Sequence, residues 1–239
     1  MNDFPTIYGF NKYSEMGINL FAPSVFLGGC NLRCPYCINC DLVHMQNVTE
    51  VPIYEVKNYI LENECKWLNI SGGEPTCSDE VELINLFKEI KSWGCKIGMA
   101  TNGTNSEVLQ RLLVHLNYVA LDIKTTDYSQ YASINSSDKD ALIEVMRSHI
   151  NIVEEKKRRS SFDYEVRTTL YPPFINIKTL MEIGSIVKKE DTWVLQKFRN
   201  NGKMLDTKCK EIDPYTDDEI ADFMISVNNM TEKAFLREI

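Results

Sequence analysis

The sequence lacks the features that would assign it to a membrane, secreted or nucleic-acid-binding class. None of its apolar runs approaches the roughly 20 residues that a membrane helix needs, and the polar start Met1-Asn2-Asp3 lacks the basic and then apolar pattern of a signal peptide. Its 26 Lys and Arg are outnumbered by 34 Asp and Glu, and the net charge of −8 disfavours a broad nucleic-acid-binding face. We therefore expect a cytoplasmic protein with no membrane or nucleic-acid partner.

Linkers, repeats and common nucleotide motifs are missing as well. No tract rich in Gly, Pro or Ser divides the 239 residues, and no internal repeat is present. The composition, 44% hydrophobic and 25% charged, is typical of a globular domain. We expect a single domain over residues 1–239, with its core at about 20–220. Because the chain has no P-loop, Gly-x-Gly-x-x-Gly or Ser-His-Asp pattern, nothing indicates a dinucleotide or serine-hydrolase site.

From about residue 24 onward, short apolar runs alternate with amphipathic segments, which is the pattern of repeated β-α units around a parallel sheet. Capping-box spacing predicts two helix starts, one at Thr104 with Glu107 and one at Thr216 with Glu219. His149 falls on an apolar helix stripe and is expected in the core. The six predicted strands span residues 24–29, 67–71, 96–101, 118–123, 164–170 and 192–198.

Polar side chains gather where the predicted strands end. On the fourth strand, Asp122 and Lys124 share one face, opposite apolar residues that suit burial under helices. Ser71 ends the second strand, Asn102 follows the third, and Arg167 lies near the end of the fifth. The carboxyl ends of parallel strands lie at one edge of a sheet or barrel, where chemistry usually takes place. The pattern therefore predicts a pocket at this edge, and unrelated salt bridges are the alternative for any single strand.

Four of the eight cysteines lie between residues 30 and 40. Cys30, Cys34 and Cys37 occupy a loop directly after the first predicted strand, and three soft ligands so close together suit zinc or an iron–sulfur cluster. Structural zinc takes four ligands, whereas three cysteines can hold a cubic cluster with one iron left open. We expect Cys40 to be a non-ligand, although as a fourth ligand it would close the site. The isolated cysteines are expected to be small buried residues: Cys65, Cys77, Cys95 and Cys209.

The cysteine spacing, Cys-x3-Cys-x2-Cys with Tyr36 before the last cysteine, resembles the signature of the radical S-adenosylmethionine (SAM) enzymes. Segment 72–76, Gly-Gly-Glu-Pro-Thr, resembles the second motif of that family, in the order and spacing that the family expects. The resemblance implies that Cys30, Cys34 and Cys37 hold a [4Fe–4S] cluster. It also implies that the open iron binds the amino and carboxylate groups of S-adenosyl-L-methionine, whose reductive cleavage gives a 5′-deoxyadenosyl radical.

The same resemblance implies roles for the residues around the cofactor. Gly72 and Gly73 lack Cβ, so backbone groups can approach its methionine part, and Glu74 supplies an acceptor for its ammonium. Asp122 and Lys124 are implied as catalytic residues near the cofactor carboxylate or the substrate. The implied cofactor-binding residues are Tyr36 near the adenine, Ser71, Gly72, Gly73, Glu74, Pro75 in the turn, Asn102 and Arg167.

Similarity extends to Thr-Asn-Gly-Thr at 101–104, Ala-Leu-Asp-Ile-Lys at 120–124 and Val-Arg-Thr-Thr at 166–169. With the two motifs, these segments resemble the activating enzymes of glycyl radical proteins, above all those of anaerobic ribonucleoside-triphosphate reductases. The resemblance implies an α/β fold, an incomplete (β/α)6 TIM-like barrel with a lateral opening and a cluster-binding loop after the first strand. It implies a glycyl radical protein as partner and substrate, and flavodoxin or ferredoxin as reductant.

Some positions depart from the pattern of these relatives. Ile38 stands where they often carry a polar residue, and Ala100 stands where pyruvate formate-lyase activators carry an acidic one, which argues against a cation site. A second reading is therefore a radical SAM enzyme acting on a small molecule, a peptide or a nucleotide-like heterocycle, as in 7-carboxy-7-deazaguanine synthases. A third is a non-enzymatic zinc or iron–sulfur module that uses Cys40 as fourth ligand. For the strand-end residues, Asp122–Lys124 or Glu165–Arg167 ion pairs are the structural alternative.

Overall fold

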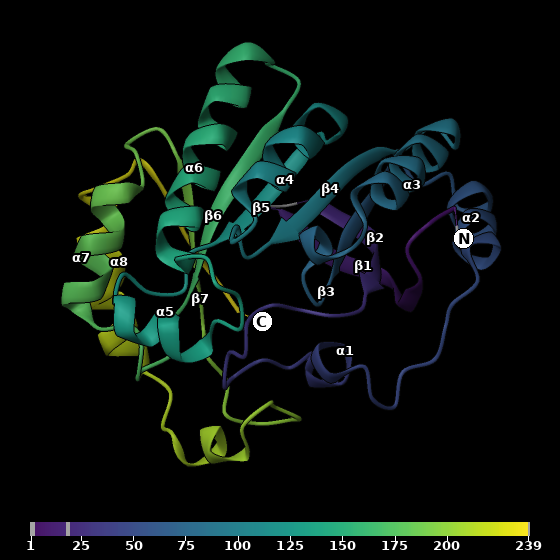
Figure 1. The fold of residues 1–239 in the computed structure, drawn as a ribbon. Coiled ribbons are helices and arrows are strands. Elements are labelled where there is room, and N and C mark those ends of the chain that lie inside the picture. The colour runs from purple at the N-terminus through teal and green to yellow at the C-terminus, as the bar shows by residue number, and fades with distance from the viewer. Residues whose placement is uncertain (1–2, 18–19, 239) are drawn as a thin grey trace.

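A computed structural model describes residues 3–17 and 20–238. One eight-stranded sheet, in the order β1 to β8, curls into a half-barrel, and helices cover its outer face (Figure 1). The strands are β1 (Ile7–Gly17), β2 (Leu20–Leu27), β3 (Trp67–Gly72), β4 (Lys96–Thr101), β5 (Tyr118–Asp122), β6 (Asp163–Thr169), β7 (Thr192–Gln196) and β8 (Lys233–Arg237). The α-helices are α1 (Cys40–His44), α2 (Ile53–Glu62), α3 (Glu80–Ser92), α4 (Ser106–Leu112), α5 (Tyr128–Ile134), α6 (Ala141–Arg158), α7 (Ile177–Ile186) and α8 (Asp217–Asn228). Three short 3-10 helices are η1 (Pro75–Cys77), η2 (Leu113–His115) and η3 (Thr207–Glu211).

The six predicted strands correspond to β2 to β7, which run parallel to one another. The sheet is larger than predicted because β1 pairs antiparallel with β2 and β8 pairs parallel with β7. Both added strands lie at the ends of the strand order. Edge strands are half solvated, so β1 is rich in polar residues, and its register shifts mark bulges that break the alternation. This explains why neither strand showed a strong apolar run.

Helices pack on the sheet through the stripes that the sequence predicts. In α3, Leu83, Leu86, Phe87 and Ile90 are all buried. The capping box at Thr216 is confirmed at the start of α8. The helix start predicted at Thr104 is wrong, because α4 begins at Ser106 and the Thr104 hydroxyl donates instead to Asn102 Oδ1, at 2.6 Å.

His149 is buried on α6, as predicted, and its Nε2 lies 2.6 Å from Asp191 Oδ2. Asp191 in turn accepts hydrogen bonds from the Tyr164 hydroxyl and the Lys188 amide. The histidine therefore belongs to a buried polar network between α6 and the start of β7. No helix within residues 3–17 and 20–238 is long and apolar enough to cross a membrane.

Candidate active site

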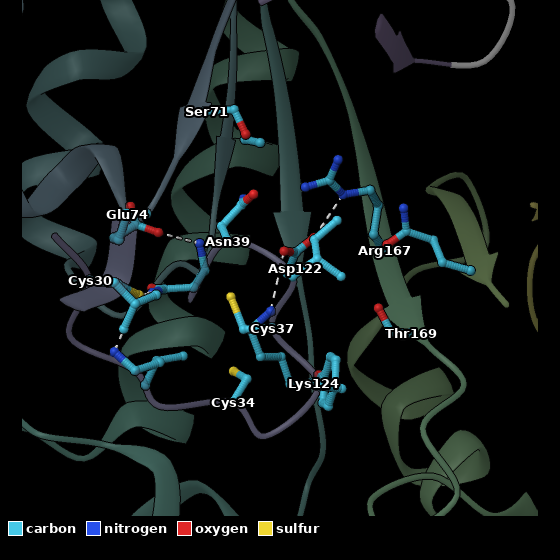
Figure 2. Close-up of a pocket in the computed structure, with 18 of the residues that line it drawn as sticks. Cys30, Cys34, Cys37, Asn39, Ser71, Glu74, Asp122, Lys124, Arg167 and Thr169 are labelled. Atoms are coloured by element: carbon cyan, nitrogen blue, oxygen red, sulfur yellow. Dashed lines mark hydrogen bonds and ion pairs between the residues drawn. The ribbon is translucent and has the colours of Figure 1, made fainter. Parts of the chain in front are cut away.

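A cavity of about 400 Å³ opens at the carboxyl edge of the parallel strands, where the loop after β2 crosses the mouth of the half-barrel (Figure 2). It brings together twelve residues that the sequence analysis singled out. They are Cys30, Cys34, Tyr36, Cys37, Ser71, Gly72, Gly73, Glu74, Asn102, Asp122, Lys124 and Arg167. The strand register explains this convergence, since Leu27 pairs with Gly72 and Asp122 with Arg167 at the same edge.

The cysteine loop is held by its backbone. The Arg33 amide donates to the Ile134 carbonyl at 2.7 Å, and the Arg33 guanidinium donates to the Cys30 carbonyl at 2.6 Å. Burial raises the pKa of the Cys30 thiol to about 12 and that of Cys34 to about 11, with the Glu74 charge adding to the first. Free thiolates are therefore disfavoured in this pocket, and a bound cationic metal would reverse this, because it deprotonates the thiols that ligate it.

Three cysteine thiolates are a donor set that suits an iron–sulfur cluster with one open iron. Within the described ranges, no three cysteine, histidine or carboxylate side chains converge on one ion-sized point. A cubic cluster takes each cysteine on a different iron, so its ligands surround a larger volume. Cys30, Cys34 and Cys37 all border one cavity (Figure 2). Their role as ligands stays a prediction that this arrangement supports.

Of the other cysteines, Cys40 is buried at the start of α1 and, among the described residues, is not part of the cavity wall. This placement supports its prediction as a non-ligand. Cys95 and Cys209 are buried as predicted, and Cys65 is half-buried. For Cys77 the prediction of burial is wrong: it ends η1 at the rim, before α3 begins to cover the sheet, and is exposed.

The glycine turn after β3 packs directly on the chain that leaves β2. Gly72 has φ +116°, and a Cβ on Gly73 would lie 1.8 Å from the Gly29 carbonyl oxygen. The Gly73 and Glu74 amides donate to the Leu27 and Gly29 carbonyls at 2.9 and 2.8 Å. Both glycines are therefore required by backbone contact within the chain, a reason that the sequence analysis did not give.

Glu74 is fully buried and already accepts four hydrogen bonds. Its Oε1 accepts from the Thr76 amide, the Thr76 hydroxyl and the Thr101 hydroxyl, at 3.0, 2.6 and 2.7 Å. Its Oε2 accepts from the Asn102 amide at 2.6 Å. Burial raises the pKa of this carboxyl, while the hydrogen bonds oppose the rise. Besides the ammonium contact implied for it, Glu74 thus ties the exit of β3 to the exit of β4.

Asn102 continues this network toward the cysteine loop. Its Nδ2 lies 3.1 Å from Asn31 Oδ1 and 3.9 Å from Cys30 Sγ, and its Oδ1 accepts from the Thr104 amide and hydroxyl. We refer to Gly72, Gly73, Glu74 and Asn102, with Cys30 beside them, as the hydrogen-bonded wall of the pocket.

The opposite side is formed by Asp122, Lys124 and Arg167, which we call the charged wall (Figure 2). Arg167 Nε donates to Asp122 Oδ1 at 2.7 Å, and Lys124 Nζ donates to Oδ2 at 3.3 Å. Burial raises the pKa of Asp122, but its two cationic partners hold it below its usual range. The Asp122–Lys124 pair considered from the sequence is present, whereas the Glu165–Arg167 pair is not: Glu165 binds Arg237, on β8, which the sequence analysis did not identify as a strand.

Tyr36 and Phe198 line the remaining part of the cavity, and Tyr171 and Phe174 pack against the Tyr36 ring. The Tyr36 ring lies 4.6 Å from that of Tyr171, and Phe174 and Phe198 pack edge-on at 6.1 and 6.5 Å. The Tyr36 hydroxyl is buried and has no hydrogen-bond partner among the described residues. Pro75 is the first residue of η1 and, in the part of the chain that the structure describes, does not line the cavity.

Sequence reasoning missed several residues of the site. Asn39 Nδ2 donates to the Gly72 carbonyl at 2.8 Å and so joins the cysteine loop to the glycine turn. Its place two residues after the last cysteine was the available signal. The segment after β7 also crosses the cysteine loop: the Leu205 and Asp206 amides donate to the Cys37 and Pro35 carbonyls, at 3.0 and 2.9 Å. Nothing local in the sequence indicates that crossing.

Residues 24–163 match the family described as the Radical SAM superfamily. The chain is 30% identical over 178 residues to a Methanocaldococcus jannaschii protein named as a glycyl-radical enzyme activating enzyme, covering 73% of this chain and 71% of that one. It is 30% identical over 134 residues to the pyruvate formate-lyase-activating enzyme of Clostridium pasteurianum, covering 54% and 56%. It is 27% identical over 177 residues to the 7-carboxy-7-deazaguanine synthase of Aquifex aeolicus, covering 73% and 79%.

Two solved structures share the fold. TYW1 with a lysine–pyruvate adduct bound superposes with a TM-score of 0.57 at 15% identity, over 87% of this chain and 73% of that one. A domain of pyruvate-formate lyase-activating enzyme from Bacteroides vulgatus superposes with a TM-score of 0.52 at 12% identity, over 71% and 97%. The predicted α/β architecture, an incomplete TIM-like barrel, is confirmed.

Proposed function

Because this chain belongs to the radical SAM superfamily, we propose that it is an activating enzyme that abstracts a hydrogen atom from a glycine of a partner glycyl radical protein. The observation that carries the proposal is the 30% identity over 71% of the Methanocaldococcus jannaschii protein named as such an activating enzyme. The pyruvate formate-lyase-activating enzyme of Clostridium pasteurianum supports it over a shorter span. An anaerobic ribonucleotide reductase is the partner type that the sequence motifs favour.

The cofactors of the superfamily are a [4Fe–4S] cluster and SAM. When bound, they supply an electron and a 5′-deoxyadenosyl radical able to abstract hydrogen. In this chain, Cys30, Cys34 and Cys37 would hold the cluster at the cavity wall. Cys34 is buried and Cys30 and Cys37 are partly buried, so the protein would shield part of a bound cluster from water.

The two walls would hold the cofactor from opposite sides. The hydrogen-bonded wall, with Ser71 next to its glycine turn, presents backbone groups to the methionine part, and Pro75 holds the turn from outside the cavity. On the charged wall, Lys124 and Arg167 carry positive charges next to the cavity, and these suit the cofactor carboxylate. The Tyr36 side chain borders the cavity, and an adenine edge placed there could satisfy its unpaired hydroxyl.

Access for a protein substrate is available at the mouth of the cavity. Ile38, with 63% of its surface exposed, borders the opening together with Arg199 and Asn201 from the segment after β7. An exposed apolar side chain at a rim suits contact with a partner protein. The proposed reductant is a flavodoxin or ferredoxin, and the proposed location is the cytoplasm.

The experiment is anaerobic incubation of the reconstituted enzyme, reductant and SAM with the glycyl radical protein encoded beside it, followed by electron paramagnetic resonance. We expect a glycyl doublet that is absent with the Cys34→Ala variant. If SAM is cleaved to 5′-deoxyadenosine and no glycyl doublet forms, the activase proposal is wrong, while the superfamily chemistry stands.

A small heterocyclic substrate is the second candidate. The chain matches 79% of the Aquifex aeolicus 7-carboxy-7-deazaguanine synthase, and Ile38 and Ala100 depart from the activase pattern. Incubation with the substrate of a 7-carboxy-7-deazaguanine synthase, with the product detected by mass spectrometry, distinguishes the two. Turnover of that compound with no glycyl doublet would favour this candidate. Family membership disfavours the non-enzymatic zinc module.

A further inference from the structure

A row of charged side chains runs inside the half-barrel from the pocket to its far end. The signs alternate along the row, which consists of Lys124, Asp122, Arg167, Glu165, Arg237 and Glu15. Beyond the charged wall, Arg237 Nη1 and Nη2 donate to the two Glu165 carboxylate oxygens at 2.9 and 3.1 Å. Arg237 Nε donates to Glu15 at 2.9 Å. We call Glu165, Arg237 and Glu15 the lower charge row.

Because Glu165 and Arg237 are buried, each charge needs its ion-pair partner. The Glu165 side chain is fully buried and that of Arg237 is 7% exposed, so neither charge can be left to water. Both Glu165 carboxylate oxygens accept hydrogen bonds from Arg237. With its charge matched in this way, Glu165 does not draw on Arg167, which stands two residues along β6 on the same face.

The charge of Arg167 interacts with the carboxylates of Asp122 and Glu165. Burial lowers the pKa of its guanidinium, but the charges of Asp122 and Glu165 raise it overall. Its Nε is committed to Asp122. Because Glu165 and Arg167 lie on the same face of β6, a Glu165 without Arg237 would compete with Asp122 for the Arg167 guanidinium.

The lower charge row also joins the two ends of the sheet. Glu15 lies in β1 and Arg237 in β8, the first and last strands of the order. Their ion pair links two strands that lie 222 residues apart in sequence at this contact. A change at Arg237 therefore removes contacts to both β6 and β1.

We propose that Glu165 and Arg237 are positioning residues for the cofactor: they hold Arg167 on Asp122, and through it keep Asp122 and Lys124 facing the pocket. When Arg237 loses its charge, Glu165 becomes an unmatched buried anion and Arg167 turns toward it. Asp122 then keeps only Lys124, and the charged wall loses its geometry. This rests on the proposed function only in taking the charged wall to face SAM.

The test measures SAM binding to the cluster-loaded enzyme, with the KM for SAM and kcat for 5′-deoxyadenosine formation. We expect Arg237→Met to weaken SAM binding roughly tenfold, the size of effect typical for residues that act through another group. The KM for SAM should rise by a larger factor than the factor by which kcat falls. In the double variant Glu165→Gln/Arg237→Met the unmatched anion is gone, so affinity should recover to within about threefold of the wild type.

Two further variants keep the outcome interpretable. Arg237→Lys retains the charge and with it the fold, but loses the two-pronged contact, and should weaken binding by an intermediate factor. Arg111→Met, which removes an exposed ion pair with Glu80 on the outer helices, is the matched control and should leave binding unchanged. Thermal melting of each variant reports the fold separately.

Unchanged SAM affinity in both Arg237 variants would overturn the proposal. So would a double variant that binds as weakly as Arg237→Met, since that would indicate a merely structural loss. Failure of the enzyme to activate a glycyl radical protein would leave these SAM measurements intact, so the two proposals fail independently.

Discussion

The hydrogen-bonded wall and the charged wall face the same cavity but are held by different forces. Glu74 is fixed by four neutral donors that come from residues 76, 101 and 102. Asp122 is fixed by two cations, one of which depends in turn on charges from β8 and β1. The hydrogen-bonded wall is held by several short-range hydrogen bonds around one carboxylate. The charged wall is held by a series of ion pairs whose charges act over longer distances. This difference predicts that the first wall tolerates almost no change in shape, whereas the second responds to changes in charge far away.

The largest expected effect removes one of the three cysteines proposed to hold the cluster at the border of the cavity. Cys34→Ala should abolish cluster retention and SAM cleavage, because a cluster held by three cysteines cannot lose one and stay bound. Iron content and 5′-deoxyadenosine after anaerobic reconstitution measure both. Cys40→Ala is the matched control and should leave both largely intact. Loss of the cluster in the control would show that Cys40 is a ligand.

The next effect probes shape. Gly73→Ala should lower the free energy of unfolding by about 3 kcal/mol, because its Cβ would lie 1.8 Å from the Gly29 carbonyl oxygen, which must move. Gly94→Ala is the comparison: its φ is +82° but nothing lies within 4 Å of the added Cβ. It should cost only about 1 kcal/mol of left-handed strain. Chemical unfolding measures both, and equal losses would mean that close backbone contact does not limit this wall.

A smaller effect tests the hydrogen bonds themselves. Glu74→Gln replaces one acceptor oxygen by an NH2 group, which must face either the Asn102 amide or the Thr76 and Thr101 donors. We expect a loss of about 2 kcal/mol in the free energy of unfolding, the cost of a buried donor facing a donor. Glu80→Gln, at an exposed ion pair, should cost less than about 1 kcal/mol. Equal losses for the two variants would contradict the account of the wall.

The smallest effect concerns a buried charge outside the pocket. Burial raises the pKa of Asp191, but hydrogen bonds from His149, Tyr164 and the Lys188 amide hold it below its usual range. A lowered folded-state pKa stabilises the fold above the unfolded value of about 3.9, and this is lost as the pH falls through the folded pKa. In Asp191→Asn, the free energy of unfolding should therefore fall less steeply below about pH 4. The loss between neutral and acidic pH should be smaller than in the wild type by about 1 kcal/mol. Urea midpoints at pH 3 to 7 measure it, and parallel curves for the two proteins would refute it.

The sequence predicted the parts of this molecule that leave a local signature. β2 to β7 follow apolar runs, and strand alternation places Asp122 and Lys124 together in the pocket. The cysteine spacing and the glycine segment predicted one side of the cavity because the residues of each motif lie within a few positions of one another in the sequence.

What could not be predicted are contacts between distant segments. The Arg237–Glu15 ion pair joins residues that are 222 positions apart in sequence, and the Lys203–Asp41 ion pair joins residues that are 162 positions apart. Neither residue type nor spacing shows such a pair, because any basic residue could match any acidic one. Thr104 failed as a helix start for a different, local reason: its hydroxyl donates to Asn102 Oδ1, two residues earlier, instead of capping a helix.

The most direct test of the account is the electron paramagnetic resonance spectrum of the reduced protein with and without SAM. If three cysteines hold a [4Fe–4S] cluster with one iron free for the cofactor, adding SAM will shift the g-values of the reduced cluster. An identical spectrum in the presence of saturating SAM, or a protein that binds zinc and no iron under anaerobic reconstitution, would contradict it.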